Sequence, residues 1–304
     1  MSSIVEKFAL KALHVFQIRT LTQLGLGTRV TLSNKSHSKG PLVTEYRIDL
    51  TVFSPDGTTS VYREDIARLP PDSAVSLDCG QWQDAAQDQV MIFHLMPMRL
   101  LPQADADQCV DIERSEIWSL FTAQDHYVEY YWPDGFSSGV LYQSGAFNYR
   151  KFSREETTVI QAPKVFLTET LDTLLSILHT SFEPGYARQA ILKCSLLNAQ
   201  GEALVKSVFM LAPGMAQSIS MKSMLSEAGQ SLPTGQEMHH YTLLAMCDNA
   251  ALLPLVLNVD QSTQTLAVEH SLPPMYYGQS VTGVVRAKMI DELKHSGIFL
   301  QEEH

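Results

Sequence analysis

The feature that most constrains this 304-residue chain is an internal repeat. The stretch HVFQIRTLTQL at His14–Leu24 returns as KVFLTETLDTL at Lys164–Leu174, with a valine, a phenylalanine, a threonine and two leucines in register. The segments that follow each copy also recur in the same order. The repeat therefore predicts two versions of one module, and the chain has room for two at roughly 150 residues per domain.

The segments behind each copy have the pattern of antiparallel strands. Tyr46–Val52 alternates apolar and polar residues, as a strand with one buried face does. A turn follows at Ser54–Gly57, because proline presets φ and glycine accepts a positive φ. In the second half, Ala190–Leu197 is followed by a turn at Asn198–Gly201 and a returning segment at Glu202–Met210. The pattern is that of an all-β protein.

We therefore predict two tandem, duplicated β-sandwich modules, Ig-like or jelly-roll-like, with two lipocalin-like β-barrel modules as the alternative. The predicted domain organisation is an N-terminal helix at 1–13, a first β module at 14–150, a linker at 151–163 and a second β module with a C-terminal extension at 164–304.

Two segments need a decision between helix and strand. Ser3 and Glu6 have the spacing of a capping box, and apolar residues follow at helical intervals, so we expect a short helix from Ile4 to His14. The leucines of 168–179 also have helical spacing. The equivalent stretch of the first module contains two glycines and alternates, and one duplicated module should have one topology. We therefore predict a strand at 168–179 and leave the helix open.

Charge limits the partners that this chain can bind. Its 22 basic and 33 acidic residues give a net charge of −11 without a long run of either sign, which argues against nucleic acid or an anionic membrane surface. No window is long and apolar enough for a membrane span, and the N-terminus does not resemble a signal peptide. Four scattered cysteines predict free thiols in a cytoplasmic protein. We expect no metal and no cofactor.

The candidate site residues lie in a segment that occurs once in each half. Asp125-His126 is followed by aromatic residues, and so is Glu269-His270, which suggests that the two histidines correspond. If Asp125–Trp132 is one strand, its alternate residues share a face, and both faces mix polar and aromatic side chains. The predicted ligand-binding residues are Tyr130, Tyr131, Trp132, Tyr276 and Tyr277. His126 and His270 are the catalytic candidates, with a structural role as the simpler interpretation.

The expected function is binding of a small-molecule ligand or a protein partner near the interface of the two modules, without catalysis. The first alternative is an enzyme of the isomerase, cyclase or dehydratase type, in which His126 or His270 transfers a proton on a small apolar substrate. The second alternative is a structural assembly subunit that pairs through exposed strand edges, and a homo-oligomer is compatible with it. The motif GxSxG at Gly135–Gly139 is predicted to be a hairpin turn rather than a nucleophile elbow.

Overall fold

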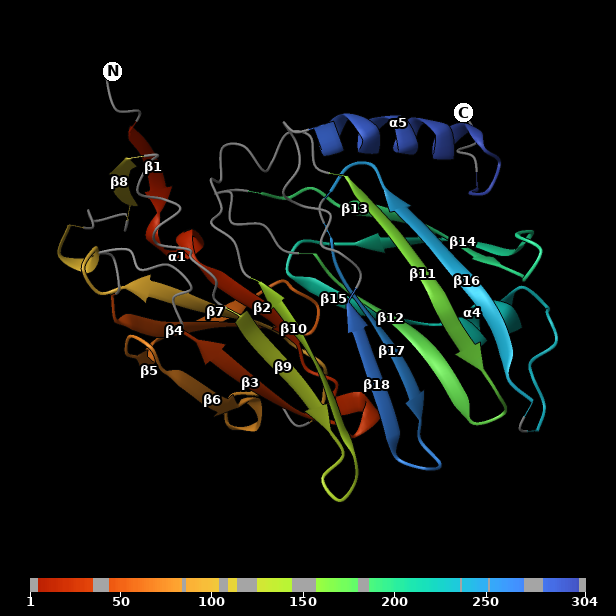
Figure 1. Cartoon of the computed structure of the whole chain (residues 1–304), viewed down its shortest axis with the longest axis horizontal. Coiled ribbons are helices and arrows are strands. Elements are labelled where there is room, and N and C mark those ends of the chain that lie inside the picture. The colour runs from red at the N-terminus through yellow and green to blue at the C-terminus, as the bar shows by residue number, and fades with distance from the viewer. Residues whose placement is uncertain are drawn as a thin grey trace. The chain divides into compact units, whose positions relative to one another are not determined.

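A computed structural model describes residues 5–34, 44–83, 86–103, 109–113, 125–143, 157–179, 186–235, 237–250, 252–270 and 281–300 of the chain. Antiparallel strands dominate it (Figure 1). Contacts within the chain define two compact units, one with most of residues 1–154 and the other with most of residues 155–304. We call these units the first and the second module.

The first module contains two four-stranded sheets and a two-stranded one. In the order of pairing, the first sheet contains β2 (Val15–Arg19), β7 (Val90–Pro97), β4 (Tyr46–Phe53) and β5 (Ser60–Leu69). The second sheet contains β10 (Ser137–Gln143), β9 (Asp125–Tyr131), β3 (Gly27–Ser33) and β6 (Ala74–Asp78). Strand β1 (Val5–Ala9) pairs with β8 (Cys109–Glu113), and the short helix α1 (Leu10–Leu13) follows β1. Single 3₁₀ turns lie at Thr22–Leu24, Cys79–Gln81 and Leu101–Gln103.

The second module also contains two four-stranded sheets. Its first sheet contains, in order, β11 (Thr158–Leu167), β16 (His239–Cys247), β13 (Ala190–Leu197) and β14 (Ala203–Leu211). Its second sheet contains β18 (Thr265–His270), β17 (Leu253–Asp260), β12 (Leu171–His179) and β15 (Met215–Ser220). Two helices complete it, α4 (Met221–Glu227) and α5 (Val281–His295).

The strand order is the same in both modules. Counted along the chain without β1 and β8, the first sheet of each module pairs strands one, six, three and four, and the second pairs strands eight, seven, two and five. This is what the internal repeat predicts. Each of these described sheets is open and ends in two edge strands, so the sandwich prediction holds and the lipocalin-like alternative does not.

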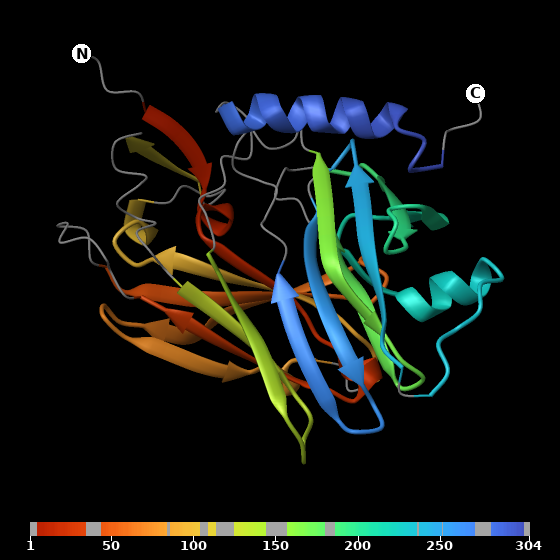
Figure 2. The ribbon, with the colours of Figure 1, turned by 45° about the vertical axis from the view of Figure 1, so that its right-hand side comes forward.

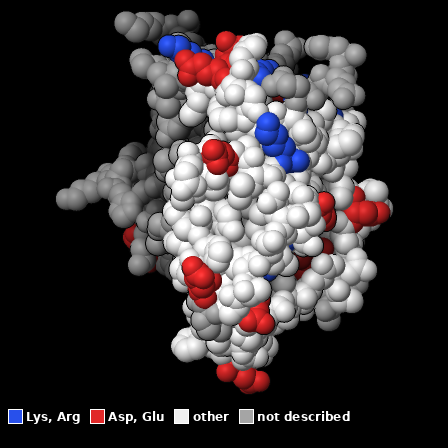
Figure 3. Space-filling view, turned by 90° about the vertical axis from the view of Figure 1, so that its right-hand side faces the viewer, with Lys and Arg blue, Asp and Glu red and all other residues white. Residues whose placement is uncertain are grey.

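A terminal segment covers part of the outer face of the first sheet in each module. In the first module, Leu10 and Leu13 of α1 pack on Met96 of β7. In the second module, Ile290 of α5 and Phe299 pack on Met246 of β16, and Figure 2 shows α5 lying alongside that sheet. Elsewhere the surface of the second module carries few charged side chains on the face seen in Figure 3.

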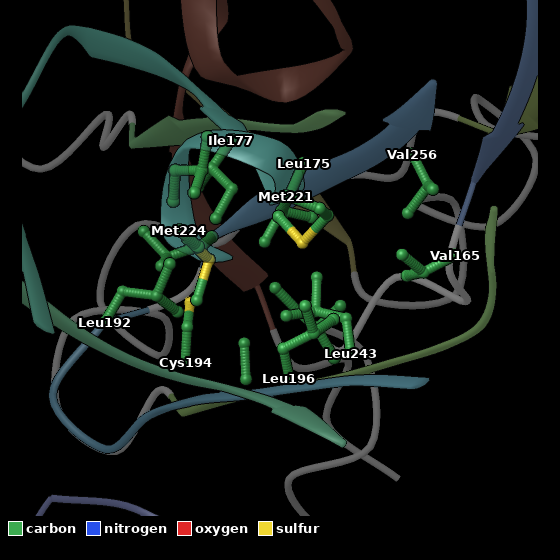
Figure 4. Close-up of a cluster of buried hydrophobic side chains, with 14 of the residues drawn as sticks. Val165, Leu175, Ile177, Leu192, Cys194, Leu196, Met221, Met224, Leu243 and Val256 are labelled. Atoms are coloured by element: carbon green, nitrogen blue, oxygen red, sulfur yellow. The ribbon is translucent and has the colours of Figure 1, made fainter. Parts of the chain in front are cut away.

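The core of the second module lies between its two sheets, where alternation along each strand sends apolar residues inward. Leu192, Cys194 and Leu196 of β13 face Leu175 and Ile177 of β12, and Met221 and Met224 of α4 pack among them (Figure 4). Each fully buried leucine or isoleucine contributes about 1.5–3 kcal/mol to folding. In the first module, a ring contact between Phe16 of β2 and His126 of β9, with centroids 5.1 Å apart, joins the two sheets.

The structure decides the two segments that were ambiguous in sequence. The expected helix from Ile4 to His14 is wrong over most of its length: Val5–Ala9 is strand β1, which pairs residue by residue with β8, and only Leu10–Leu13 is helical. Segment 168–179 contains strand β12, as predicted. It is a central strand with both faces covered, so its leucines are buried on both sides and mimic helical spacing.

The repeated stretch His14–Leu24 contains strand β2, which ends at Arg19, and a 3₁₀ turn, which Gly25 caps with a left-handed φ of 77°. One predicted boundary differs from the observed one. Strand β11 begins at Thr158, inside the range predicted as linker. Among the helices that the structure describes, none combines the length and apolar character that a membrane crossing requires.

Candidate functional site

His126 lies on the inner face of β9, fully buried. Its Nδ1 accepts a hydrogen bond of 3.2 Å from the backbone N–H of Ser33 in the neighbouring strand β3. An imidazole nitrogen that accepts carries no proton, so neutral His126 has its proton on Nε2. That atom lies 3.3 Å from Nε2 of His14, which then accepts. The hydrogen-bond directions therefore assign one tautomer to each ring.

This histidine pair is built to stay neutral. Burial lowers the pKa of His126 to about 3, and burial together with the charge of His126 lowers the pKa of His14 well below its usual value. A proton added to Nδ1 of His126 would face the Ser33 N–H, donor against donor. A metal ion at the two Nε2 atoms would need that same proton on Nδ1. The pair therefore fits a structural role better than acid–base catalysis or metal binding.

The correspondence between His126 and His270 is wrong. His126 is the second residue of β9, whereas His270 is the last residue of β18, and the strand order makes β18 the equivalent of β10. The first module contains an additional segment between β7 and β9, which includes β8, and this segment shifts the later part of the sequence match. The side chain of His270 and the residues Tyr276 and Tyr277 lie outside the described part of the chain, so their roles stay predictions.

Strand β9 separates the three remaining candidate residues. Tyr130 and Trp132 are buried on the inner side, and the Tyr130 hydroxyl donates a hydrogen bond of 2.8 Å to the carbonyl of Arg19. Tyr131 points the other way and is only partly covered. Its hydroxyl donates to Asp78 of β6 at 2.8 Å. Of these three residues, Tyr131 is the one that solvent reaches.

Tyr131 belongs to a polar and aromatic surface on the outer face of sheet β10-β9-β3-β6, which we call the tyrosine face. It consists of Arg29, Asp78, Tyr127, Glu129 and Tyr131. Arg29 lies in the middle: its strand pairs it with Glu129 on one side and with Asp78 on the other, and its Nη1 lies 3.2 Å from the Glu129 carboxylate. The Arg29 guanidinium is 5.1 Å from the Tyr131 ring centroid.

Two glycines allow both tyrosine rings to lie close against the sheet. A Cβ atom on Gly27 would come within 2.3 Å of the Tyr131 ring, and one on Gly139 would come within 2.4 Å of the Tyr127 ring. Each ring thus rests on the bare backbone of a neighbouring strand. Burial raises the pKa of both phenols, with Asp78 adding to the effect at Tyr131 and Glu129 at Tyr127. Both hydroxyls therefore stay protonated at neutral pH.

A second cluster lies on the outer face of sheet β2-β7-β4-β5, around the fully buried carboxylate of Asp49. Asp49 accepts hydrogen bonds from Arg47 Nη2 and from the backbone N–H of Asp65, both at 2.7 Å, and from the Tyr62 hydroxyl. The register of β4 and β5 shifts here, and Asp65 has a φ of 53°. Asp49 therefore holds a β-bulge in place.

The same cluster fastens the N-terminal segment to the sheet. The Lys11 ammonium lies 3.4 Å from the centroid of the Tyr62 ring, and the Lys11 carbonyl accepts a bond of 2.6 Å from Nδ1 of His94. Nε2 of His94 then accepts from the Thr51 hydroxyl at 2.8 Å. Burial lowers the pKa of His94 to about 4. The role of this cluster is therefore structural: it holds the N-terminal segment on the sheet.

Neither cluster was found as such from the sequence. The alternation of β9 indicated that Tyr127, Glu129 and Tyr131 share a face, but Arg29 and Asp78 join it only through the pairing of β3 with β9 and β6. Over the residues that the structure describes, no three His, Cys, Asp or Glu side chains are arranged to hold a metal ion. All four cysteines are free thiols, and burial raises the pKa of Cys194.

Comparisons with known proteins do not assign a family. No protein-family model matches the chain, and no curated protein matches it. The match to a glycosyl hydrolase family 2 member from Bacteroides cellulosilyticus covers 84% of this chain and 27% of that structure's chain, with 8% identity and a TM-score of 0.21. The match to a putative beta-galactosidase from Bacteroides fragilis covers 87% of this chain and 34% of that structure's chain, with 8% identity and a TM-score of 0.17. The match to the infectious bursal disease virus VP2 subviral particle covers 98% of this chain and 90% of that structure's chain, with 8% identity and a TM-score of 0.20.

The chain thus spans about a quarter of the length of the first glycosyl hydrolase structures that it matches. TM-scores this low carry no argument about function. A function for this chain must therefore be argued from its own residues.

Proposed function

We propose that this chain is a binding protein and that its tyrosine face recognises a neutral, hydroxyl-rich ligand of the saccharide class. The observation that carries the proposal is the pair of tyrosine rings held close against Gly27 and Gly139, with Arg29, Glu129 and Asp78 between and beside them. Flat aromatic rings bind the apolar faces of sugar rings, and the charged groups between them donate and accept hydrogen bonds.

The charges on this face favour a neutral ligand. Two carboxylates surround one guanidinium, which disfavours a phosphate-bearing ligand because phosphate recognition needs an excess of positive charge. A purely apolar ligand is disfavoured as well, since it would remove water from Arg29 and Glu129 without replacing their hydrogen bonds. A compact ring with many hydroxyl groups carries no negative charge and can still hydrogen-bond to Arg29 and Glu129.

The spacing of the rings favours a chain of sugars over a single one. Tyr127 and Tyr131 are four residues apart on one strand, which places their Cα atoms about 13 Å apart. An oligosaccharide spans that distance, with its middle unit above Arg29 and Glu129. The Arg29 side chain is 46% exposed and can move toward such a ligand.

Isothermal titration calorimetry with cellohexaose, xylohexaose and mannohexaose tests the proposal. At least one of these neutral probes should bind the full chain, and replacing both Tyr127 and Tyr131 by alanine should weaken that binding by at least about tenfold, or about 1.4 kcal/mol. Tyr62→Phe, on the outer face of the other sheet, is the matched control and should bind like the wild type.

A second measurement covers the case in which the double variant does not fold. Tyr127 and Tyr131 of the wild type should react with N-acetylimidazole, and a bound hexasaccharide should protect them while leaving Tyr62 unchanged, as read by mass spectrometry. The proposal fails if none of the probes binds at millimolar concentration, or if binding occurs without protecting either tyrosine.

A further inference from the structure

Among the strands that the structure describes, β14 has a free edge, and this edge differs from its counterpart in the first module. β14 is the edge strand of sheet β11-β16-β13-β14, and β5 takes the same place in sheet β2-β7-β4-β5. An edge strand presents unpaired backbone N–H and C=O groups, which can pair with another chain unless the edge is protected. The two modules therefore allow a direct comparison of one protected and one unprotected edge.

Strand β5 has the protection that edge strands usually carry. It contains a register shift opposite Asp49, with Asp65 at a φ of 53°. Arg63, Glu64, Asp65 and Arg68 are all exposed on it, and Arg68 pairs with Asp65 at 2.6 Å. A bulge and dense charges both oppose the addition of another strand.

Strand β14 lacks these devices along most of its length. Its register with β13 is regular from Ala190↔Leu211 to Leu196↔Val205. Val208 and Met210 lie next to each other on the outward row and are 44% and 58% exposed. Lys206 is the single charged residue between Ala203 and Leu211, and its ammonium donates to the Gly297 carbonyl at 2.5 Å, so it is turned toward its own C-terminal segment.

We propose that two copies of this chain associate through their β14 strands, antiparallel and related by a twofold axis near Val208, which joins two four-stranded sheets into one. Antiparallel pairing about Val208 places the exposed valine of one copy beside that of the other, and each Met210 beside the methylene stem of Lys206 of the partner copy. No like charges become neighbours.

A second copy fits this edge better than a charged protein segment does. The outward row offers two apolar side chains and a single ammonium that is already bonded, so a charged segment would find nothing to pair with its own charges. The matching surface is another β14, with the same length and the same apolar row. The face of the second module seen in Figure 3 is sparsely charged.

The interface is small, because it consists of one strand pair and its flanking side chains. Interfaces below about 1,200 Å² are weak and transient, so we expect a dimer that forms in the micromolar range. Sedimentation velocity on the full chain from about 1 to 200 µM should show a reversible monomer–dimer equilibrium. Val208→Lys should weaken dimerisation at least tenfold, while Val61→Lys on β5 should not change it.

Cross-linking keeps the test decisive if Val208→Lys does not fold. In Val208→Cys the two introduced thiols of a dimer lie opposite each other, at Cα distances of about 4.5–5.5 Å that permit a disulfide. Oxidation should give a covalent dimer whose bridge is mapped to position 208, whereas Val61→Cys should give none. A chain that stays monomeric throughout, a dimer equally weakened by Val61→Lys, or capture of a different protein at β14 in place of self-association overturns the proposal.

Discussion

Asn34 and His179 hold the same turn in the two modules, with different side chains. Nδ2 of Asn34 donates to the carbonyl of Leu69 at the end of β5, and Nδ1 of His179 donates to the carbonyl of Leu211 at the end of β14. The backbone carbonyl of Asn34 accepts from the Asp72 N–H at 3.0 Å, and that of His179 accepts from the Gly214 N–H at 2.7 Å. One buried polar side chain thus fixes the crossing between the two sheets in each module.

Because the two modules share this turn, glycine should be the preferred residue at the same position in both. Asp72 has a φ of 54° and Gly214 has a φ of 80°, so both adopt the left-handed region, which glycine occupies without strain. Asp72→Gly should therefore raise the free energy of unfolding by about 0.5–1 kcal/mol. Gly214→Ala should lower it by about 1–2 kcal/mol. Urea denaturation measures both, and a destabilised Asp72→Gly would contradict the equivalence.

Hydrophobic alternation and turn residues were enough to predict the strands, and the repeated stretch was enough to predict the duplication. They failed where tertiary contacts outweigh local pattern. Ser3 and Glu6 suggested a helix cap, yet Glu6 lies in a strand that pairs with Ile112, a partner more than a hundred positions away. Leucine spacing over 171–178 resembled a helix because a central strand is buried on both faces.

The site was predicted less well, for a related reason. The sequence indicated the aromatic residues of β9, but neighbours in sequence face opposite ways on a strand, so Tyr130 and Tyr131 have different surroundings. Arg29, Asp78 and the glycines beneath the rings come from other strands, and only the pairing register brings them together. Local sequence does not contain that register when a strand's neighbours are far away in the chain.

Acid should destabilise the first module through His126. Its folded pKa is about 3, below the ordinary value of about 6.5 for an unfolded histidine. The unfolded chain therefore takes up a proton that the folded chain excludes, so the stabilisation is complete above pH 6.5 and declines as pH falls toward 3. Between pH 7 and pH 5, His126 alone should account for a loss of about 2 kcal/mol.

The variant His126→Gln keeps an acceptor for the Ser33 N–H and removes the titration. Its free energy of unfolding should fall by about 2 kcal/mol less than that of the wild type between pH 7 and pH 5. Equal pH profiles for wild type and His126→Gln would rule out this role of the histidine.

Gly27→Ala should disturb the tyrosine face without touching its functional groups. The added methyl would meet the far end of the Tyr131 ring, which can swing away, so we expect a small loss of stability, about 1 kcal/mol, together with loss of the bond from Tyr131 to Asp78. The accessible tyrosine area should rise, as followed by the rate of reaction with N-acetylimidazole. Ser60→Ala, on the edge strand β5 of the other sheet, is the control and should leave this rate unchanged.

Asp49 should be among the most sensitive polar residues of the first module. Asp49→Ala would leave Arg47, the Tyr62 hydroxyl and the Asp65 N–H without their common acceptor, in a place that solvent reaches poorly. Losing one partner of such a buried charged network costs about 3–5 kcal/mol, more than the loss of an exposed pair. Asp65→Ala, which breaks the exposed pair with Arg68 but keeps the backbone N–H, should cost clearly less.

Because Asp49 holds the bulge, its loss should also alter the protected edge at β5. Hydrogen exchange at residues 60–69 should accelerate more in Asp49→Ala than exchange in β14, and Asp65→Ala should leave this segment close to wild type. A similar cost for the two variants would show that Asp49 does not organise the bulge. If Asp49→Ala also creates concentration-dependent association, the bulge itself keeps β5 from pairing, which is the contrast with β14 on which the dimer proposal depends.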